Sequence, residues 1–124
     1  KIKDYNLSEV YKIMGFHHQA EDFFSVLDGF VMSSEEEGLG SSVLDAFLYE
    51  VPVASTNAGG LKDLLNDQRG EVCSIHSPKE LAKCIDAVLN HDERTELQIQ
   101  NAKKYVAEYH SMEYITNQYL ALLK

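Results

Sequence analysis

Short apolar runs alternate with helical patterns along most of the chain, and no other feature limits the fold as much. The apolar runs do not alternate strictly between apolar and polar residues. This lack of alternation is typical of strands buried on both faces. The segments between them repeat apolar residues with a helical period. The expected strands cover residues 10–14, 29–32, 52–55 and 71–75. The expected helices cover residues 20–27, 41–49, 61–65, 77–90, 93–109 and 112–123.

This order predicts an α/β protein: a Rossmann-like parallel sheet with helices on both faces, followed by C-terminal helices. In open sheets of this class, ligands bind beyond the carboxyl ends of the strands. Small or polar residues follow three of the expected strands, namely Gly15, Ser33-Ser34 and Thr56-Asn57. We therefore expect a binding site at that edge of the sheet.

Serines stand at the start of two expected helices. Ser77, Pro78 and Glu80 have the spacing of a capping box with proline in the first turn. Ser41 or Ser42 is expected to cap the helix that it precedes. A nucleophilic role is disfavoured there, because no motif places a histidine base beside either hydroxyl.

The composition excludes several classes of protein. The chain has 124 residues and a net charge of −9, so we expect one domain or part of one, and an acidic surface that repels nucleic acid. No apolar run reaches the ~18 residues of a membrane span, and the N-terminus lacks the apolar stretch of a signal peptide. Cys73 and Cys84 fit no metal-binding spacing, so both are expected to be reduced and buried in a cytoplasmic protein.

The segment SSEEEGLGSSVLDAF, residues 33–47, places two glycines between an expected strand and an expected helix. Gly38 and Gly40 let the backbone turn tightly and let a ligand approach its amides. The first turn of the helix adds unpaired N–H groups and a partial positive charge, which favour a phosphate. The signal is weak by itself, since neither the GxGxxG nor the GxxxxGK(S/T) motif is present.

Glu37 and Asp45 flank these glycines, and a carboxylate beside a phosphate is costly unless it accepts hydrogen bonds from another group. Sugar hydroxyls would serve, because one carboxylate can accept both hydroxyls of a vicinal diol. A nucleotide sugar fits, with Glu37 at one ring and Asp45 at the other. The alternative is structural: acidic residues near a helix N-terminus complement its dipole, and three successive glutamates often form a solvated turn.

Glu37-x7-Asp45 resembles the E-x7-E signature of retaining glycosyltransferases of the GT-B fold, in the group 1 family. DGFVMSS (28–34), with Gly15-Phe16 upstream, resembles that family's GF…advfvlPS, and PVASTNAGGLKDL (52–64) resembles its PVvatdvGGlpElv. The resemblance covers nearly the whole chain. It implies the donor-binding C-terminal domain of an enzyme that transfers a sugar from a nucleotide diphosphate sugar to a glycan or lipid-linked acceptor, as in bacterial surface polysaccharide synthesis.

The resemblance also implies roles for the matched residues. Glu37 would take the catalytic position at the transferred sugar, and Asp45 would bind the ribose hydroxyls. Transfer in this family retains anomeric configuration and needs no metal or other cofactor, because protein donors stabilise the leaving diphosphate. The intact enzyme would be cytoplasmic, either free or bound peripherally at the inner face of the membrane. The implied donor-binding residues are Gly38, Leu39, Gly40, Ser41 and Asp45 with, near the base, Gly15, Phe16 and His17.

The chain departs from the family pattern in two ways. Asp45 stands where the signature has glutamate, so its carboxylate is one methylene shorter and the ribose contact is looser or water-bridged. Residues 1–124 are expected to form a single partial domain, without the acceptor-binding N-terminal domain, the first two βα units and their basic pair. We therefore expect this chain alone to be inactive.

The expected absence of two βα units bears on the sheet. In the strand order 3-2-1-4-5-6 the absent strands lie mid-sheet. The strand over residues 10–14 would then pair with the strand over residues 29–32 or with another copy of the chain. An open sheet edge also favours self-association.

Other interpretations remain open for the function and for some residues. A GT-B epimerase acting on a nucleotide sugar would share the architecture, and a non-catalytic nucleotide-sugar-binding or interaction module is conceivable because Asp45 alters the signature. His17-His18 has no partner at ligand spacing, so we expect a loop or a base contact rather than a metal site. The tyrosines between residues 105 and 119 are expected to pack, with part of the helix face over residues 114–123 exposed.

Overall fold

The computed structural model describes residues 2–19 and 21–123. These residues form a three-stranded parallel sheet in the order β1-β2-β3, surrounded by helices. In chain order, the elements are α1 (Glu21–Phe24), β1 (Phe30–Met32), α2 (Ser41–Leu48), β2 (Val53–Thr56), α3 (Leu61–Leu65), β3 (Glu71–Cys73), α4 (Pro78–Leu89), α5 (Glu93–Tyr109) and α6 (Met112–Leu122).

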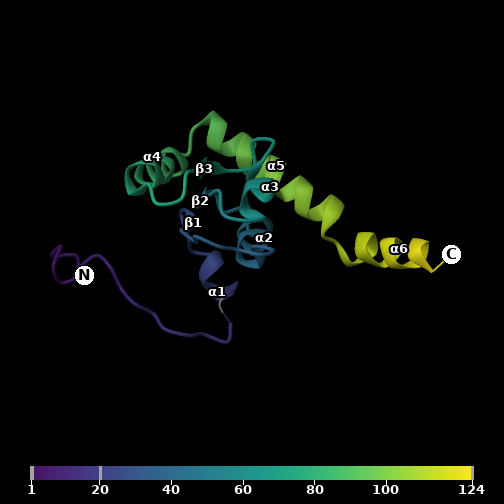
Figure 1. Cartoon of the computed structure of the whole chain (residues 1–124), viewed down its shortest axis with the longest axis horizontal. Coiled ribbons are helices and arrows are strands. Elements are labelled where there is room, and N and C mark those ends of the chain that lie inside the picture. The colour runs from purple at the N-terminus through teal and green to yellow at the C-terminus, as the bar shows by residue number, and fades with distance from the viewer. Residues whose placement is uncertain (1, 20, 124) are drawn as a thin grey trace.

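The central strand β2 sets the layers of the fold. All four of its residues are buried, as expected for a strand that is covered on both faces. Its neighbours are in register with it, so that Ser55 lies opposite Met32 of β1 and Thr56 opposite Cys73 of β3. Figure 1 shows α4 on one side of the strands and α2 and α3 on the other. The predicted parallel α/β sheet is confirmed.

The core lies between the sheet and α2, α3 and α5. Helix α2 buries Val43, Ala46 and Phe47, an i, i+3, i+4 spacing that gives the helix one apolar face. Leu61 of α3 and Ala102 of α5 complete this cluster. Because α2 follows β1, its N-terminus lies at the carboxyl edge of the sheet, where the ligand site is expected.

The strand predicted over residues 10–14 is wrong. The N–H groups of Val10 and Tyr11 bond to the carbonyl of Leu7, at 3.0 and 2.7 Å, and the side chains of Val10 and Ile13 are 80% exposed. A strand requires a hydrogen-bonded neighbour, and among the described residues β1 pairs only with β2, so the predicted pairing with residues 29–32 is also wrong. Figure 1 shows this segment running apart from the sheet. Self-association through the open edge of β1 stays a prediction.

The predicted serine cap of α2 is also wrong. Gly40 is the N-cap residue, in the left-handed region (φ 64°), and no side chain caps the helix. Ser41 is instead the first residue of α2, with Ser42 after it. A left-handed glycine turns the chain into the helix without a polar side chain.

The predicted capping box of α4 does not form either, although Ser77 is the N-cap and Pro78 follows it as expected. The Ser77 side chain makes no capping bond. Glu80 Oε2 accepts a hydrogen bond from the Ser74 N–H at 2.9 Å, which lowers the pKa of the Glu80 carboxyl. The left-handed turn at His76 (φ 61°) lies between the two partners, so loop geometry decides where this carboxylate bonds.

The first helix is shorter in the structure than in the prediction. Helix α1 covers only four residues of the expected 20–27, and Ala20 lies outside the described residues. Phe24 of α1 packs its ring against Phe30 at a centroid distance of 5.4 Å.

The exposed face predicted for α6 is confirmed, with Tyr119 67% and Leu122 81% exposed. No helix within the described residues is long and apolar enough to cross a membrane.

Both cysteines are free thiols, with Cys73 buried at the end of β3 and Cys84 half-buried on α4. Loss of solvent raises the pKa of both thiols, that of Cys84 to about 11. Burial favours the neutral form of a thiol. Both side chains are therefore protonated at neutral pH and behave as small apolar residues.

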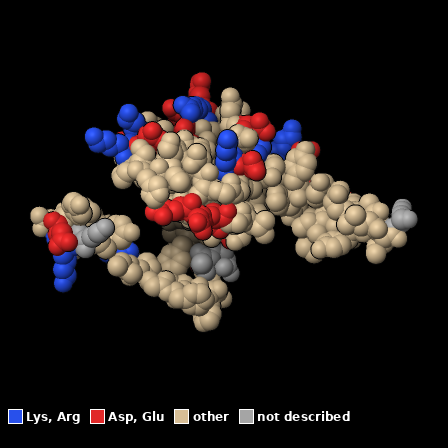
Figure 2. All heavy atoms as spheres, viewed as in Figure 1, with Lys and Arg blue, Asp and Glu red and all other residues tan. Residues whose placement is uncertain are grey.

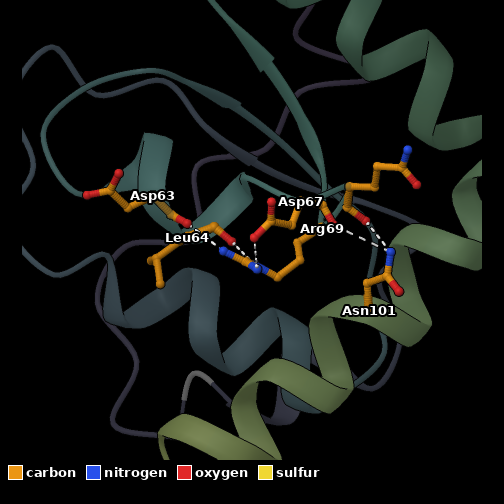
Figure 3. A network of polar contacts seen from close by, with 6 residues as sticks. Asp63, Leu64, Asp67, Arg69 and Asn101 are labelled. Carbon is orange, nitrogen blue, oxygen red and sulfur yellow. Dashed lines mark hydrogen bonds and ion pairs between the residues drawn. The ribbon is translucent and has the colours of Figure 1, made fainter.

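Arg69 fastens the C-terminal end of α3 to α5. Its Nε donates to the Leu64 carbonyl and its Nη2 to the Asp63 carbonyl, both at 2.6 Å, and these belong to the carbonyls that a helix end leaves unpaired. The guanidinium carbon lies 4.0 Å from the centroid of the Tyr105 ring on α5. Asn101 of α5 also donates to the turn that follows α3 (Figure 3). The short α3 is thus held at its far end by the longest helix.

Replacing Arg69 by methionine should lower the free energy of unfolding by about 2–4 kcal/mol, because it removes two charge-assisted hydrogen bonds and a cation–π contact. Urea unfolding measures the change. The control is Lys103→Met, which breaks a half-exposed ion pair with Glu50 at 3.2 Å and should remove no more than about 1 kcal/mol. Equal losses in the two variants would contradict the role of Arg69.

Candidate functional site

The loop between β1 and α2 is anchored by two hydroxyl groups. The Thr56 hydroxyl at the end of β2 donates to the Ser34 carbonyl at 2.6 Å. The Ser34 hydroxyl in turn donates to Glu37 Oε2 at 3.3 Å. Glu37 is half-buried, so its carboxylate is oriented by the loop while part of it remains accessible to a ligand.

Two glycines before α3 pack against the backbone of this loop. The Gly60 N–H donates to the Glu37 carbonyl at 3.3 Å. A Cβ atom on Gly59 would overlap the Glu37 carbonyl oxygen, and one on Gly60 would overlap the Gly38 carbonyl oxygen. Gly59 also has a left-handed backbone (φ 50°). Only glycine therefore allows the two loops to meet backbone to backbone.

Gly40 and Gly38 have different surroundings. A Cβ atom on Gly40 would lie 2.8 Å from Leu61 Cδ2 and 3.0 Å from Leu64 Cδ1, so Gly40 is pressed against α3. Gly38 has no atom within 4 Å of the corresponding position, and the neighbouring Leu39 side chain is 84% exposed. The loop is therefore fixed on its inner side and open on its outer side, where a ligand can reach the backbone amides.

The predicted residues that follow the loop are presented by α2. Ser41 and Asp45 are both exposed, and their i, i+4 spacing puts them on one face of the helix. No side-chain hydrogen bond caps α2, and the partial positive charge at the N-terminus of a helix favours an anion there. The structure thus brings Glu37, the residues 38–40 and Asp45 into one continuous loop-and-helix unit.

The predicted base-binding segment, Gly15 to His17, lies in the exposed N-terminal part of the chain. Phe16 is 84% exposed and meets the ring of His18 edge-on at 5.1 Å. His17 Nε2 lies 2.9 Å from the Met14 carbonyl oxygen, and its ring packs against Phe23 of α1 at 4.9 Å. These contacts hold the segment to α1, and its role at a nucleotide base stays a prediction.

The charges around the site do not suggest a metal centre. Within residues 2–19 and 21–123, no three or more His, Cys, Asp or Glu side chains are grouped so that they could hold a metal ion. In Figure 2, Lys and Arg side chains gather mainly over α4 and α5 on the visible face, with a few more on the N-terminal segment.

Residues 1–105 match the family described as glycosyl transferases group 1. The chain belongs to this family. Among the relatives of this chain, the lipopolysaccharide core biosynthesis glycosyltransferase LpsE of Rhizobium meliloti is 30% identical over 122 residues, which are 97% of this chain and 36% of LpsE. The capsular polysaccharide biosynthesis glycosyltransferase CapM of Staphylococcus aureus is 29% identical over 75% of this chain and 25% of CapM. The chain thus spans about a third or less of the length of these glycosyltransferases.

Solved structures share the fold of this chain. The structure of Anabaena HepE in complex with UDP has a TM-score of 0.88 at 23% identity, over 98% of this chain and 34% of HepE. The C-terminal domain of the group 1 family protein LpcC from Francisella tularensis has a TM-score of 0.73 at 20% identity, over 90% of this chain and 59% of that domain. The chain therefore has the fold of the C-terminal domain of GT-B glycosyltransferases.

Sequence reasoning missed the residues that hold the loop in place. In the sequence, Gly59 and Gly60 show a family resemblance but no structural role, and Thr56 is recognisable only as a polar residue after a strand. The contacts of these residues join the loops that follow β1 and β2, and Thr56 lies 22 residues from its partner Ser34 in the sequence. The glycine pair directly before a helix was the one local signal of a close backbone approach.

Gly59→Ala should lower the free energy of unfolding by about 2–4 kcal/mol, because alanine is strained at φ 50° and its methyl group would displace the Glu37 carbonyl. The matched control is Gly38→Ala, which has open space around it and should change stability by no more than about 0.5 kcal/mol. Urea unfolding of both variants measures the difference. Similar stabilities would show that the two loops do not pack as described.

Proposed function

We propose that the loop from Glu37 to Gly40 and the first turns of α2 bind a nucleotide diphosphate sugar, within an enzyme that transfers the sugar to a glycan or lipid-linked acceptor with retention of configuration. One observation carries this proposal. An open glycine loop leads into a helix that no side chain caps, with a half-buried carboxylate before it and an exposed carboxylate on its second turn.

The diphosphate would lie at the loop and the N-terminus of α2. The backbone amides of Leu39, Gly40 and Ser41 would supply donors, and the helix dipole adds a partial positive charge. Donors that are fixed before the reaction also stabilise a leaving diphosphate without reorganisation. Such donors would allow transfer without a bound metal. The structure of HepE with UDP supports a uridine nucleotide as the first candidate.

The two carboxylates would hold the two rings of the donor. Ser34 orients the Glu37 carboxylate, which can accept hydroxyls of the transferred sugar. Asp45 lies farther along α2 and would accept the ribose hydroxyls, with the shorter reach of an aspartate. Gly15, Phe16 and His17 would approach the base.

The rest of the proposal concerns the intact protein. The names of LpsE and CapM refer to lipopolysaccharide core and capsular polysaccharide biosynthesis, and they support an enzyme that extends a surface glycan. Its cytoplasmic location stays a prediction. The 124-residue chain, which spans 36% of LpsE, should bind the donor without turning it over. The acceptor would bind to other parts of the protein.

Thermal unfolding of the chain with UDP, UDP-glucose, GDP and ADP tests the donor site. A ligand at 100 times its Kd stabilises the folded state by about 2.7 kcal/mol, which raises the Tm by several degrees in a domain of this size. The shift should be lost or strongly reduced in Glu37→Ala and Asp45→Ala. Glu36→Ala is the matched control, because Glu36 is an exposed carboxylate next to Glu37.

Two results would contradict the proposal. One is the absence of a Tm shift with every nucleotide at millimolar concentration. The other is a shift that persists unchanged in both Glu37→Ala and Asp45→Ala, since the ligand would then bind elsewhere.

A further inference from the structure

A cavity opens at the carboxyl edge of the sheet, between the end of β1 and the start of α4. Its volume is about 280 Å³. Ser33, Ser34 and Glu35 line one side of it, and His76 and Ser77 line the other. Thr56 also lines the cavity, and both Thr56 and Ser34 support the donor loop through the Thr56–Ser34 and Ser34–Glu37 hydrogen bonds. The cavity therefore adjoins the proposed donor site and shares two of its supporting residues, whereas Glu37 and residues 38–45 do not line it.

The polar groups of the cavity suit a ligand that carries hydroxyls. Glu35 Oε1 lies 3.3 Å from His76 Nδ1, and the two side chains, 71% and 65% exposed, bridge the β1–α2 loop and the β3–α4 loop. The Ser77 hydroxyl makes no capping bond to α4, so it can bond to a ligand. Carboxylate, imidazole and hydroxyl groups together offer both acceptors and donors.

The remaining wall is apolar and the cavity is small. Pro78 and Leu81 of α4 supply C–H surface, against which the C–H face of a sugar ring can pack. The lining includes a carboxylate and no Lys or Arg, which disfavours a phosphate or a uronate. A volume of about 280 Å³ lies just below the ~300 Å³ of the smallest typical ligand pockets, which is enough for one sugar ring.

We propose that this cavity binds a neutral pyranose ring, next to the ring that Glu37 is proposed to hold. The position of this second ring rests on the proposed function, because Ser34 lines the cavity and orients the Glu37 carboxylate. The cavity thereby gives the enzyme a subsite for a saccharide other than the transferred sugar.

The test is a titration of the isotope-labelled 124-residue chain, followed by amide NMR shifts. The probes are the methyl α-pyranosides of glucose, galactose, mannose and N-acetylglucosamine, each raised to ~100 mM, which fills a site of millimolar Kd. UDP is titrated separately. We expect at least one pyranoside to give saturable shifts in residues 33–35 and 76–81, and UDP to shift residues 38–45.

Two substitutions distinguish the cavity from the acidic loop in general. Glu35→Gln should weaken pyranoside binding about tenfold, as expected for the loss of a hydrogen bond to a charged acceptor. Glu36→Gln is the matched control, with the same charge change on an adjacent residue outside the cavity lining, and it should leave binding unchanged. Ser77→Leu fills the cavity without removing a capping bond and should abolish pyranoside binding.

The outcomes separate this inference from the proposed function. No saturable shift with any pyranoside, or equal weakening by Glu35→Gln and Glu36→Gln, overturns the inference. If UDP still shifts residues 38–45 in that case, the proposed function stands without the second subsite. Pyranoside binding at the cavity without any response to UDP would support the subsite and count against the donor site.

Discussion

The backbone of Gly59-Gly60 rests directly against the backbone of Glu37-Gly38, and the candidate site depends on this contact. The two loops leave the carboxyl ends of neighbouring parallel strands, β1 and β2, so they meet at one edge of the sheet. The Gly60 N–H then bonds to the Glu37 carbonyl. Because no side chain separates the loops, a rigid sheet sets the position of the Glu37 carboxylate and of the loop amides.

Helix α3 carries this restraint into the rest of the fold. Its first residues follow the glycine pair, Leu61 and Leu64 press on Gly40, and Arg69 ties its far end to Tyr105 on α5. A five-residue helix is too short to be stable alone, so it owes its place to these packed contacts. The loop between β1 and α2 is thereby supported from the core, while its outer side at Gly38 stays open.

The elements that depend on local pattern could be predicted from the sequence. The apolar periods of α2 and α5 and the buried run of β2 are visible in the chain itself, and so is the placement of Glu37, Gly38, Gly40 and Asp45 on one loop and helix. The conformation of residues 10–14 could not be predicted, because a strand needs a hydrogen-bonded neighbour. The apolar residues of this segment do not show whether a neighbouring strand is present. The predicted helix caps of α2 and α4 were wrong for a related reason. The left-handed backbone of Gly40 and the turn at His76 decide which polar groups form hydrogen bonds at the starts of these helices.

Amide hydrogen exchange at Gly60 tests the contact between the two loops most directly. If the Gly60 N–H is held by the Glu37 carbonyl, it should exchange as slowly as the amides of β2, even without a ligand, because its opening requires the two loops to separate. The exposed amide of Gly38 should exchange quickly in the free chain. Fast exchange at Gly60, at the rate of Gly38, would contradict the account, since the site would then lack its support from the sheet.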